Sequence, residues 1–348
     1  MIKPKPLQKG SNIAILAPSA GLSCVFPHIY QMGIKNLTEM GFNILEYPTT
    51  KMNANDVFEN PKARAEDINH AFADDNVHGI ISLIGGEDAA RILKYLDPEI
   101  IQANPKLFMG YSDFSAVSVF LNQLGLVTFN GPSVMAGFAQ LHNLSDEYRA
   151  YVKAFLYGEL VDAILPTFSH FYDGYPDWSD ASTAGQLNPI QKNVGPRFFG
   201  GNLADTDKVS GLLFGGCIEV LEMLKGTQFW PAADFWQGKV LFLETSQEKP
   251  SLDYVKYWLR NYGVMGVFEQ LSGLLVGRAR DYNADEKAQL DEVIMSVVRE
   301  EFECHSLPIV TNLDFGHTDP QVILPLGCDL QIDVKAKQIK LLGSAFNS

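Results

Sequence analysis

Short apolar segments that alternate with helix-like segments dominate the first 130 residues, and this alternation restricts the fold more than any other feature. Five segments have the length and apolar character of buried strands: 12–17, 43–47, 79–84, 107–109 and 126–129. Segments with helical spacing lie between them, at 29–40, 62–73, 88–96 and 114–124. Strands that alternate with helices predict a parallel sheet covered by helices on both faces. We therefore expect an α/β fold with a doubly wound parallel sheet.

Chain length and a change of character after residue 165 predict two domains. The 348 residues exceed the roughly 100–200 residues of an ordinary domain. We place an N-terminal domain at 1–165, an interdomain and substrate loop at 166–200, and a smaller C-terminal α/β domain at 201–348. The middle segment mixes aromatic residues with Pro, Gly, Asp and Ser without a persistent period, and long loops of this kind are commonly lids or binding elements. For the last part we expect helices at 218–224, 254–262 and 285–301, strands at 239–243, 273–276 and 308–312, and paired strands within 329–342.

The composition argues against several classes of partner. The formal net charge is −14 and no run of Lys or Arg occurs. We expect no nucleic-acid partner, because a surface that follows phosphates requires clustered cations. No window approaches ~18 uninterrupted apolar residues, so we expect no membrane partner either. The N-terminus lacks the apolar region of a signal peptide, which favours a cytoplasmic protein.

The four cysteines do not form a recognisable metal or disulfide pattern. Cys24, Cys217, Cys304 and Cys328 are scattered, and no two of them have CxxC spacing. In a large chain without a signal peptide, such residues are expected to be reduced thiols. We therefore predict no metal site.

Ser112 is the candidate nucleophile. It lies in Gly110-Tyr-Ser-Asp113, between a predicted strand and a predicted helix. A tight turn there would expose the hydroxyl and aim backbone N–H groups at a developing oxyanion. The match is to this strand–turn–helix geometry rather than to GxSxG, because Phe114 stands where the second glycine would be. The alternative is that Ser112 or Asp113 caps the following helix.

His317 and Glu244 are the candidate base and acid that a serine nucleophile requires. His317 lies in a loop just after a predicted strand, where no helical pattern explains an imidazole. Glu244 ends an apolar strand, and a buried carboxylate is costly without a partner. The order Ser112, Glu244, His317 is that of the α/β hydrolases. The alternatives are a histidine bonded to nearby backbone and an acid that caps a helix or faces solvent.

Gly85 and Gly86 follow a predicted strand and are candidate ligand-binding residues. Two glycines allow close approach of the backbone and can offer N–H donors to an oxyanion or a carboxylate. The alternative is an ordinary tight turn between strand and helix. The segment 84–88 also resembles the GGDG loop of lipid and nicotinamide-nucleotide kinases, but the last glycine is missing, and the chain has no P-loop and no GxGxxG.

An ordered series of motifs resembles the LD-carboxypeptidase family of serine peptidases. The series consists of Lys9–Ser19, Gly85-Gly86, Gly110–Asp113, Gly131-Pro132, Gly200–Leu203, Leu241–Glu244, Gly316–Thr318 and Pro325–Gly327. The resemblance implies a flavodoxin-like N-terminal domain, a smaller C-terminal domain, a homodimer and no cofactor. It also implies a catalytic triad of Ser112, Glu244 and His317, with an oxyanion hole formed by the backbone N–H groups of Gly86 and Asp113.

Two branches of this family imply different substrates. One removes the terminal D-alanine from murein tetrapeptide in cell-wall recycling. The other is similar to the microcin C immunity protein, which hydrolyses the amide between an aminoacyl group and a nucleotide. The insert with Trp178 and the segment 244–250 resemble the second branch more closely. We therefore expect an aminoacyl-nucleotide substrate, with a small peptide as the alternative.

The second branch implies substrate-binding roles for Gly85, Trp178 and Lys249. Trp178 would stack on a purine, at roughly 1–3 kcal/mol by analogy with base stacking, or would pack at the domain interface instead. Lys249 is the candidate for holding a substrate carboxylate. An alternative from another class is a binding protein that keeps the cleft between the domains but lacks catalysis.

Overall fold

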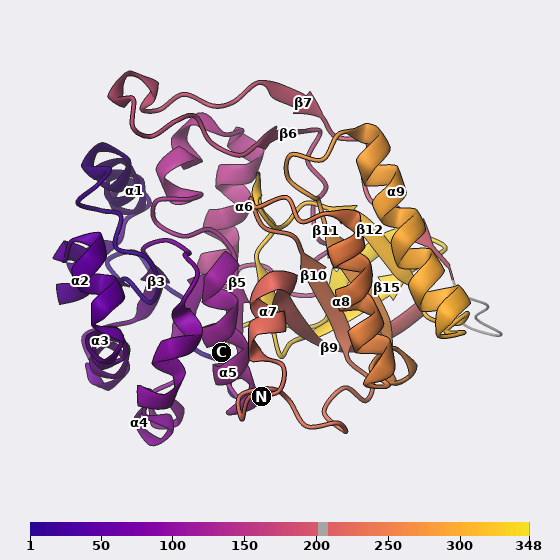
Figure 1. The fold of residues 1–348 in the computed structure, drawn as a ribbon. Coiled ribbons are helices and arrows are strands. Elements are labelled where there is room, and N and C mark those ends of the chain that lie inside the picture. The colour runs from indigo at the N-terminus through magenta and orange to yellow at the C-terminus, as the bar shows by residue number, and fades with distance from the viewer. Residues whose placement is uncertain (201–207, 348) are drawn as a thin grey trace.

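A computed structural model describes residues 1–200 and 208–347 of the chain. Two large sheets lie side by side with helices around them, one built mainly from the N-terminal half and one from the C-terminal half (Figure 1). The ends of the chain meet at the first sheet, because the Asn347 N–H donates to the Pro4 carbonyl at 2.8 Å. Within the described residues, no helix is both long enough and apolar enough to span a membrane.

The first sheet has the strand order β14-β5-β4-β3-β1-β2, in which β1 to β5 are parallel and β14 is antiparallel to β5. Its strands are β1 Asn12–Leu16, β2 Asn43–Glu46, β3 Gly79–Ser82, β4 Leu107–Gly110, β5 Thr128–Asn130 and β14 Leu324–Leu326. All residues of β3 and β4 are buried, as expected for strands covered on both faces. The order 2-1-3-4-5 is that of flavodoxin-like folds, which confirms the predicted fold class.

Helices and 3-10 turns connect these strands. The α-helices are α1 Pro27–Glu39, α2 Ala54–Glu59, α3 Pro61–Ala73, α4 Pro98–Ala103, α5 Ser115–Gln123 and α6 Asp146–Leu156. The 3-10 segments are η1 Pro48–Lys51, η2 Ala89–Tyr95, η3 Ser112–Phe114 and η4 Phe138–Asn143. Proline opens α1, α3 and α4, where its missing N–H costs no hydrogen bond. The helix predicted at 88–96 is the 3-10 segment η2 rather than an α-helix.

The second sheet has the strand order β16-β15-β9-β10-β11-β12-β8. Its strands are β8 Arg197–Phe199, β9 Lys208–Cys217, β10 Val240–Glu244, β11 Gly273–Gly277, β12 Ile309–Leu313, β15 Asp329–Asp333 and β16 Gln338–Leu341. The four central strands, β9 to β12, are parallel, and the outer three are antiparallel to their neighbours. Its helices are α7 Ile218–Leu224, α8 Leu252–Val264 and α9 Ala284–Met295, which continues as a π-helix, η7 Ser296–Glu301. Two further short 3-10 turns are η5 Ala181–Thr183 and η6 Phe268–Gln270.

The segment 166–200 is more regular than expected from its sequence. It contains β6 His170–Asp173 and β7 Ile190–Lys192, which form an antiparallel three-stranded sheet with β13 Thr318–Asp319, and it ends in β8. These strands have two to four residues each, too few to produce a visible period, and their partners lie far away in the sequence. The domain boundaries at 165 and 200 remain a prediction, and residues 201–203 of the motif Gly200–Leu203 lie outside the described residues.

Helix α5 joins the two sheets, because it packs against β5 of the first sheet and β9 of the second (Figure 1). Ser115 Oγ accepts a hydrogen bond from the Cys217 N–H at 3.0 Å. A Cβ at Gly216 would lie only 2.5 Å from Ser115 Oγ, so glycine is required for this approach. The contact brings together the carboxyl ends of β4 and β9, and β10 ends beside β9 because Glu244 pairs with Cys217. Ligands bind at such strand ends in open α/β sheets.

Candidate active site

Ser112 lies in a strained turn at the carboxyl end of β4. Its φ is 63°, in the left-handed region that residues other than glycine rarely adopt, and the residue is 9% exposed. A Cβ at Gly110 would lie 2.2 Å from Ser82 Oγ, so the turn needs glycine two residues before Ser112. The predicted sharp turn between strand and helix is therefore present. The capping alternative is not observed, because neither η3 nor α5 has a side-chain hydrogen bond at its N-cap.

Ser112, His317 and Glu244 form a row of hydrogen bonds. Ser112 Oγ lies 3.0 Å from His317 Nε2, and His317 Nδ1 lies 2.7 Å from Glu244 Oε2. His317 is 4% exposed and Glu244 1% exposed. Ser112 begins η3 just after β4, Glu244 ends β10 and His317 lies in the loop between β12 and β13. The fold therefore brings together positions that are distant in the sequence. An activated serine requires this geometry of nucleophile, base and orienting acid.

A buried ion pair holds the loop that carries His317. Arg278 Nη2 donates to Asp314 Oδ1 at 2.6 Å, and Arg278 Nη1 donates to Thr318 Oγ1 at 3.3 Å. Asn193 also donates to Asp314, at 3.1 Å. Burial raises the pKa of Asp314, and the Arg278 charge opposes this rise. We did not predict Arg278 or Asp314. Each follows an apolar strand directly, β11 and β12, and a charged residue at the end of an apolar strand is the same signal that pointed to Glu244.

Two pockets flank Ser112. One, of about 380 Å³, is largely aromatic, and its walls include Tyr111, Tyr175, Trp178, Arg280 and His317. The other, of about 500 Å³, is acidic with an apolar rim, and its walls include Phe58, Glu87, Asp88, Glu219, Met223 and Glu248. Ser112, Gly86, Ala20 and Gln247 line both pockets. A substrate that reaches Ser112 can therefore place a different group on each side of it.

Trp178 lies at the aromatic pocket, and its role in binding a substrate remains a prediction. It lines the aromatic pocket, and its ring also packs against Phe26 and Tyr175, with centroid distances of 5.7 and 5.4 Å. Lys249 is placed differently, because its Nζ pairs with Glu286 Oε1 at 2.9 Å and the residue does not line either pocket at Ser112. Its role as a carboxylate binder remains a prediction. Arg280 is the cation that lines the aromatic pocket, and no motif in the sequence pointed to it.

The glycines of the predicted oxyanion loop lie against the nucleophile. A Cβ at Gly85 would lie 2.9 Å from Ser112 Oγ and 3.6 Å from the Asp113 nitrogen. The missing side chain therefore leaves space beside both the hydroxyl and the Asp113 N–H. Gly86 lines both pockets next to this space.

Clusters suited to a metal ion are absent from residues 1–200 and 208–347: no group of three or more His, Cys, Asp or Glu side chains has the required arrangement. The four cysteines are free thiols in this part of the chain.

Comparison with known families supplies the class of the protein. Models of the N-terminal and C-terminal domains of LD-carboxypeptidases match residues 13–131 and 210–332. These matches cover more than half of the chain, which therefore belongs to the LD-carboxypeptidase family of serine peptidases. The predicted family and the predicted enzyme class are confirmed.

Individual relatives match over nearly the whole chain. It is 27% identical to a putative carboxypeptidase of Vibrio cholerae, over 98% of each chain. It is 26% identical to the microcin C7 self-immunity protein MccF of Escherichia coli, over 97% of this chain and 94% of that one. A crystal structure of an MccF-like protein from Streptococcus pneumoniae in complex with AMP has a TM-score of 0.83 and 29% identity, and the match covers 95% of this chain and 98% of that one.

Proposed function

We propose that the protein hydrolyses an amide bond in a small substrate through Ser112, His317 and Glu244. The observation that carries this proposal is the row of hydrogen bonds from Ser112 Oγ to His317 Nε2 and from Nδ1 to Glu244. An ionised carboxylate only accepts hydrogen bonds, so the proton lies on Nδ1 and the Nε2 lone pair faces the hydroxyl. This tautomer is the one that a general base requires.

The reaction follows from this arrangement. Ser112 Oγ attacks the carbonyl carbon while its proton passes to His317 Nε2, and the carbonyl oxygen becomes an oxyanion. The C–N bond then breaks, the amine leaves with the proton from Nε2, and an ester to Ser112 remains. Water repeats the sequence, giving a carboxylic acid and free serine. Glu244 stabilises the imidazolium in both steps.

The backbone N–H groups of Gly86 and Asp113 are proposed to bind the oxyanion. The space left by the missing Gly85 side chain lies next to Ser112 Oγ and the Asp113 nitrogen. Loss of one such donor typically lowers kcat by about 10²–10³-fold. The N–H groups therefore contribute as much to the rate as a side-chain catalyst would.

We propose an aminoacyl-nucleotide as the substrate class. The aromatic pocket offers Trp178 and Tyr175 for stacking on a base, and Arg280 for a phosphate or a related anion. The relatives support this choice, since one is a microcin C7 self-immunity protein and another was solved in complex with AMP. The acidic pocket on the other side of Ser112 suits an aminoacyl group with a free ammonium.

A murein tetrapeptide is the second candidate, favoured by the family to which the chain belongs and by Arg280. A guanidinium beside the aromatic pocket can bind the terminal carboxylate of a peptide. Parallel turnover of a murein tetrapeptide and an aminoacyl sulfamoyl adenylate separates the two. Cleavage of the tetrapeptide alone would overturn the aminoacyl-nucleotide proposal.

Replacement of Ser112 by Ala tests the mechanism. We expect turnover to fall by about 10⁴-fold or more, because removing the nucleophile disables the whole triad. Ser179→Ala is the matched control, since Ser179 is an exposed serine outside both pockets. A fluorophosphonate should label the wild-type protein and the control but not Ser112→Ala. Retained turnover in Ser112→Ala would contradict the mechanism, and an unlabelled wild-type protein would favour a binding protein without catalysis.

The proposal also includes a cytoplasmic homodimer, as the family resemblance implies. Light scattering coupled to size-exclusion chromatography measures the mass directly, and the chain has a mass of 38.6 kDa. A mass near that of one chain would contradict the dimer.

A further inference from the structure

Three turns meet beside Ser112, and the two proposed oxyanion donors lie in them. The turns are 18–20 after β1, 85–89 after β3 and 112–113 after β4. The Ala20 N–H donates to the Gly85 carbonyl at 3.2 Å, and a Cβ at Gly86 would lie 3.0 Å from the Ala20 nitrogen. This backbone hydrogen bond joins the first two turns, and side-chain hydrogen bonds connect the third turn to both of them.

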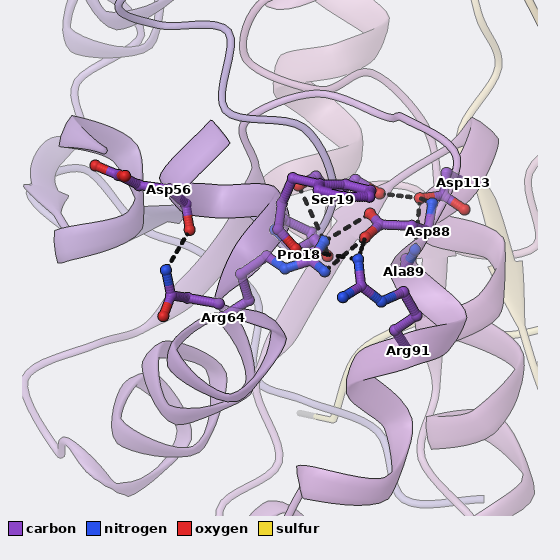
Figure 2. A network of polar contacts seen from close by, with 10 residues as sticks. Pro18, Ser19, Asp56, Arg64, Asp88, Ala89, Arg91 and Asp113 are labelled. Atoms are coloured by element: carbon purple, nitrogen blue, oxygen red, sulfur yellow. Dashed lines mark hydrogen bonds and ion pairs between the residues drawn. The ribbon is translucent and has the colours of Figure 1, made fainter. Parts of the chain in front are cut away.

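The Asp113 carboxylate connects all three turns. Its Oδ2 accepts hydrogen bonds from Ser19 Oγ, from the Asp88 N–H at 3.0 Å and from the Ala89 N–H at 2.8 Å (Figure 2). The residue is fully buried. Asp113 therefore supplies one oxyanion donor through its backbone and holds the loop of the other donor, Gly86, through its side chain.

Arg64 on α3 connects two of the same turns from the opposite side. Its guanidinium donates to both oxygens of Asp88 at 2.8 Å, and to the carbonyls of Pro18 at 3.2 Å and Ser19 at 3.1 Å (Figure 2). Arg64 is 0% exposed. Burial of a guanidinium is costly unless its donors are matched. Here one carboxylate and two carbonyls accept from Nη1 and Nη2, whereas Nε has no hydrogen-bond partner among the described residues.

We propose that Arg64 and the Asp113 carboxylate are positioning residues that hold the Gly86 and Asp113 N–H groups at the spacing the oxyanion requires. This proposal rests on the proposed hydrolytic function. Neither side chain touches the reacting atoms, and both act through the turns they connect. We call Arg64 and the Asp113 carboxylate together the clamp. Misplacement of a reacting or stabilising group by about 1 Å can lower a rate by about 10²-fold, so loss of the clamp should have a measurable effect on the rate.

Arg64→Met and Arg91→Met form a matched pair of variants. Arg91 donates to the same Asp88 carboxylate, at 2.7 Å, but its side chain is 43% exposed and its other hydrogen bond goes to the Phe58 carbonyl, outside the three turns. We expect Arg64→Met to lower the rate constant for fluorophosphonate labelling by about 10²-fold per active site. Affinity for phenylboronic acid, whose adduct with Ser112 is tetrahedral, should fall in parallel. Arg91→Met should behave as the wild type.

Asp113→Asn and Asp113→Ala form the second pair. Asp113 Oδ1 has no hydrogen-bond partner among the described residues, so an amide can take its place while the other oxygen keeps its three donors. We expect Asp113→Asn to keep most of the labelling rate and Asp113→Ala to lose about as much as Arg64→Met. Ser19→Ala, which removes a single hydrogen bond from Asp113, should lose less.

The clamp proposal would be overturned, and the proposed hydrolytic function kept, by the following result. The wild type is labelled, and Arg64→Met and Asp113→Ala show the wild-type rate constant per active site. A lower active fraction with an unchanged rate per active site would also overturn it, because that result indicates a role in stability only. If Arg64→Met does not fold, Ser19→Ala decides, and a wild-type rate and boronate affinity in that variant would overturn the clamp. A wild-type protein that is neither labelled nor active would overturn the proposed function and the clamp with it.

Discussion

At the scale of single residues, two glycines determine how closely the groups around Ser112 approach one another. Gly85 leaves the space in front of Ser112 Oγ, as described above. Gly316 has a φ of 102°, and a Cβ there would lie 2.7 Å from Glu244 Oε2. The acid can therefore reach His317 only because the residue before the histidine has no side chain.

Gly316→Ala is expected to lower activity by about 10²-fold, because the new methyl group displaces the Glu244 carboxylate from His317. The matched control is Gly10→Ala, where φ is 86° but no atom lies within 4 Å of a Cβ. Both variants should lose about 1–2 kcal/mol of stability from the left-handed backbone. Urea unfolding and turnover measure the two effects separately. Equal activity in Gly316→Ala and Gly10→Ala would contradict the expected steric clash between the new methyl group and the Glu244 carboxylate.

The residues of the candidate site were predictable to different degrees. Ser112, Glu244 and His317 each stand at a strand end or in a loop, where helix capping or a bond to nearby backbone would also explain the residue type. The ordered series of family motifs is what singles them out. Arg280 carries no such local signal. Its place at the pocket depends on how the segment after β11 packs against the segment that carries Trp178. Contacts of this kind are not encoded by spacing within one element.

At the scale of elements, β13 carries a buried acid next to the histidine loop. Asp319 is 2% exposed, and its Oδ1 accepts a hydrogen bond from Gln321 at 3.2 Å. Burial raises the pKa of Asp319 from 3.8 to about 6, and the nearby hydroxyl of Tyr175 partly opposes this rise. Tyr175 lines the aromatic pocket and belongs to the segment that also carries Trp178. The protonation state of Asp319 on β13 is therefore expected to affect the position of Tyr175 in that pocket.

Asp319→Asn is expected to remove part of the pH dependence of stability. Because the folded-state pKa lies above the unfolded value, the stabilising effect of the proton is present below about pH 4 and is lost as the pH rises to about 6. The shift of 6 minus 3.8, or about 2 units, corresponds to roughly 3 kcal/mol. The difference in free energy of unfolding, variant minus wild type, should therefore be larger at pH 7 than at pH 4 by up to that amount. Urea unfolding at both pH values measures this, and an equal difference at pH 4 and pH 7 would contradict it.

The strands that were predicted and those that were missed differ in composition and in partner. Strands β1 to β5 and β10 to β12 are apolar and parallel, and each lies close to its predicted bounds. Strand β9 contains Gly211, Gly215 and Gly216, residues typical of turns, yet a Cβ at Gly215 would lie 1.8 Å from the Phe242 carbonyl oxygen. Glycine there permits close strand packing. Strands β6 and β13 contain polar residues, and β14 has a proline at its centre, so none of the three forms an apolar run.

At the scale of the whole molecule, the two sheets share one chain segment near the C-terminus. Strand β14 pairs with β5 in the first sheet, and β15, only three residues further on, pairs with β9 in the second. Leu324 and Leu326 are fully buried. The first sheet is therefore completed by the C-terminal part of the chain, and neither sheet is independent of the other.

We expect the protein to unfold in one cooperative transition. All four tryptophans lie at or beyond residue 178, so tryptophan fluorescence reports on the C-terminal part, whereas far-UV circular dichroism reports on both sheets. Urea transitions followed by the two signals should coincide. Two separate midpoints would show that β14 does not couple the sheets.

The proposed triad has a temporal consequence, because its nucleophile and base lie 205 residues apart in the chain. Synthesis proceeds from the N-terminus at about 5–20 residues per second, so a ribosome makes His317 roughly 10–40 s after Ser112. During that interval the first sheet also lacks β14, and Ser112 remains an ordinary alcohol. A polypeptide that ends before His317 would therefore leave cellular amides intact, and hydrolysis would begin only after His317 has been made.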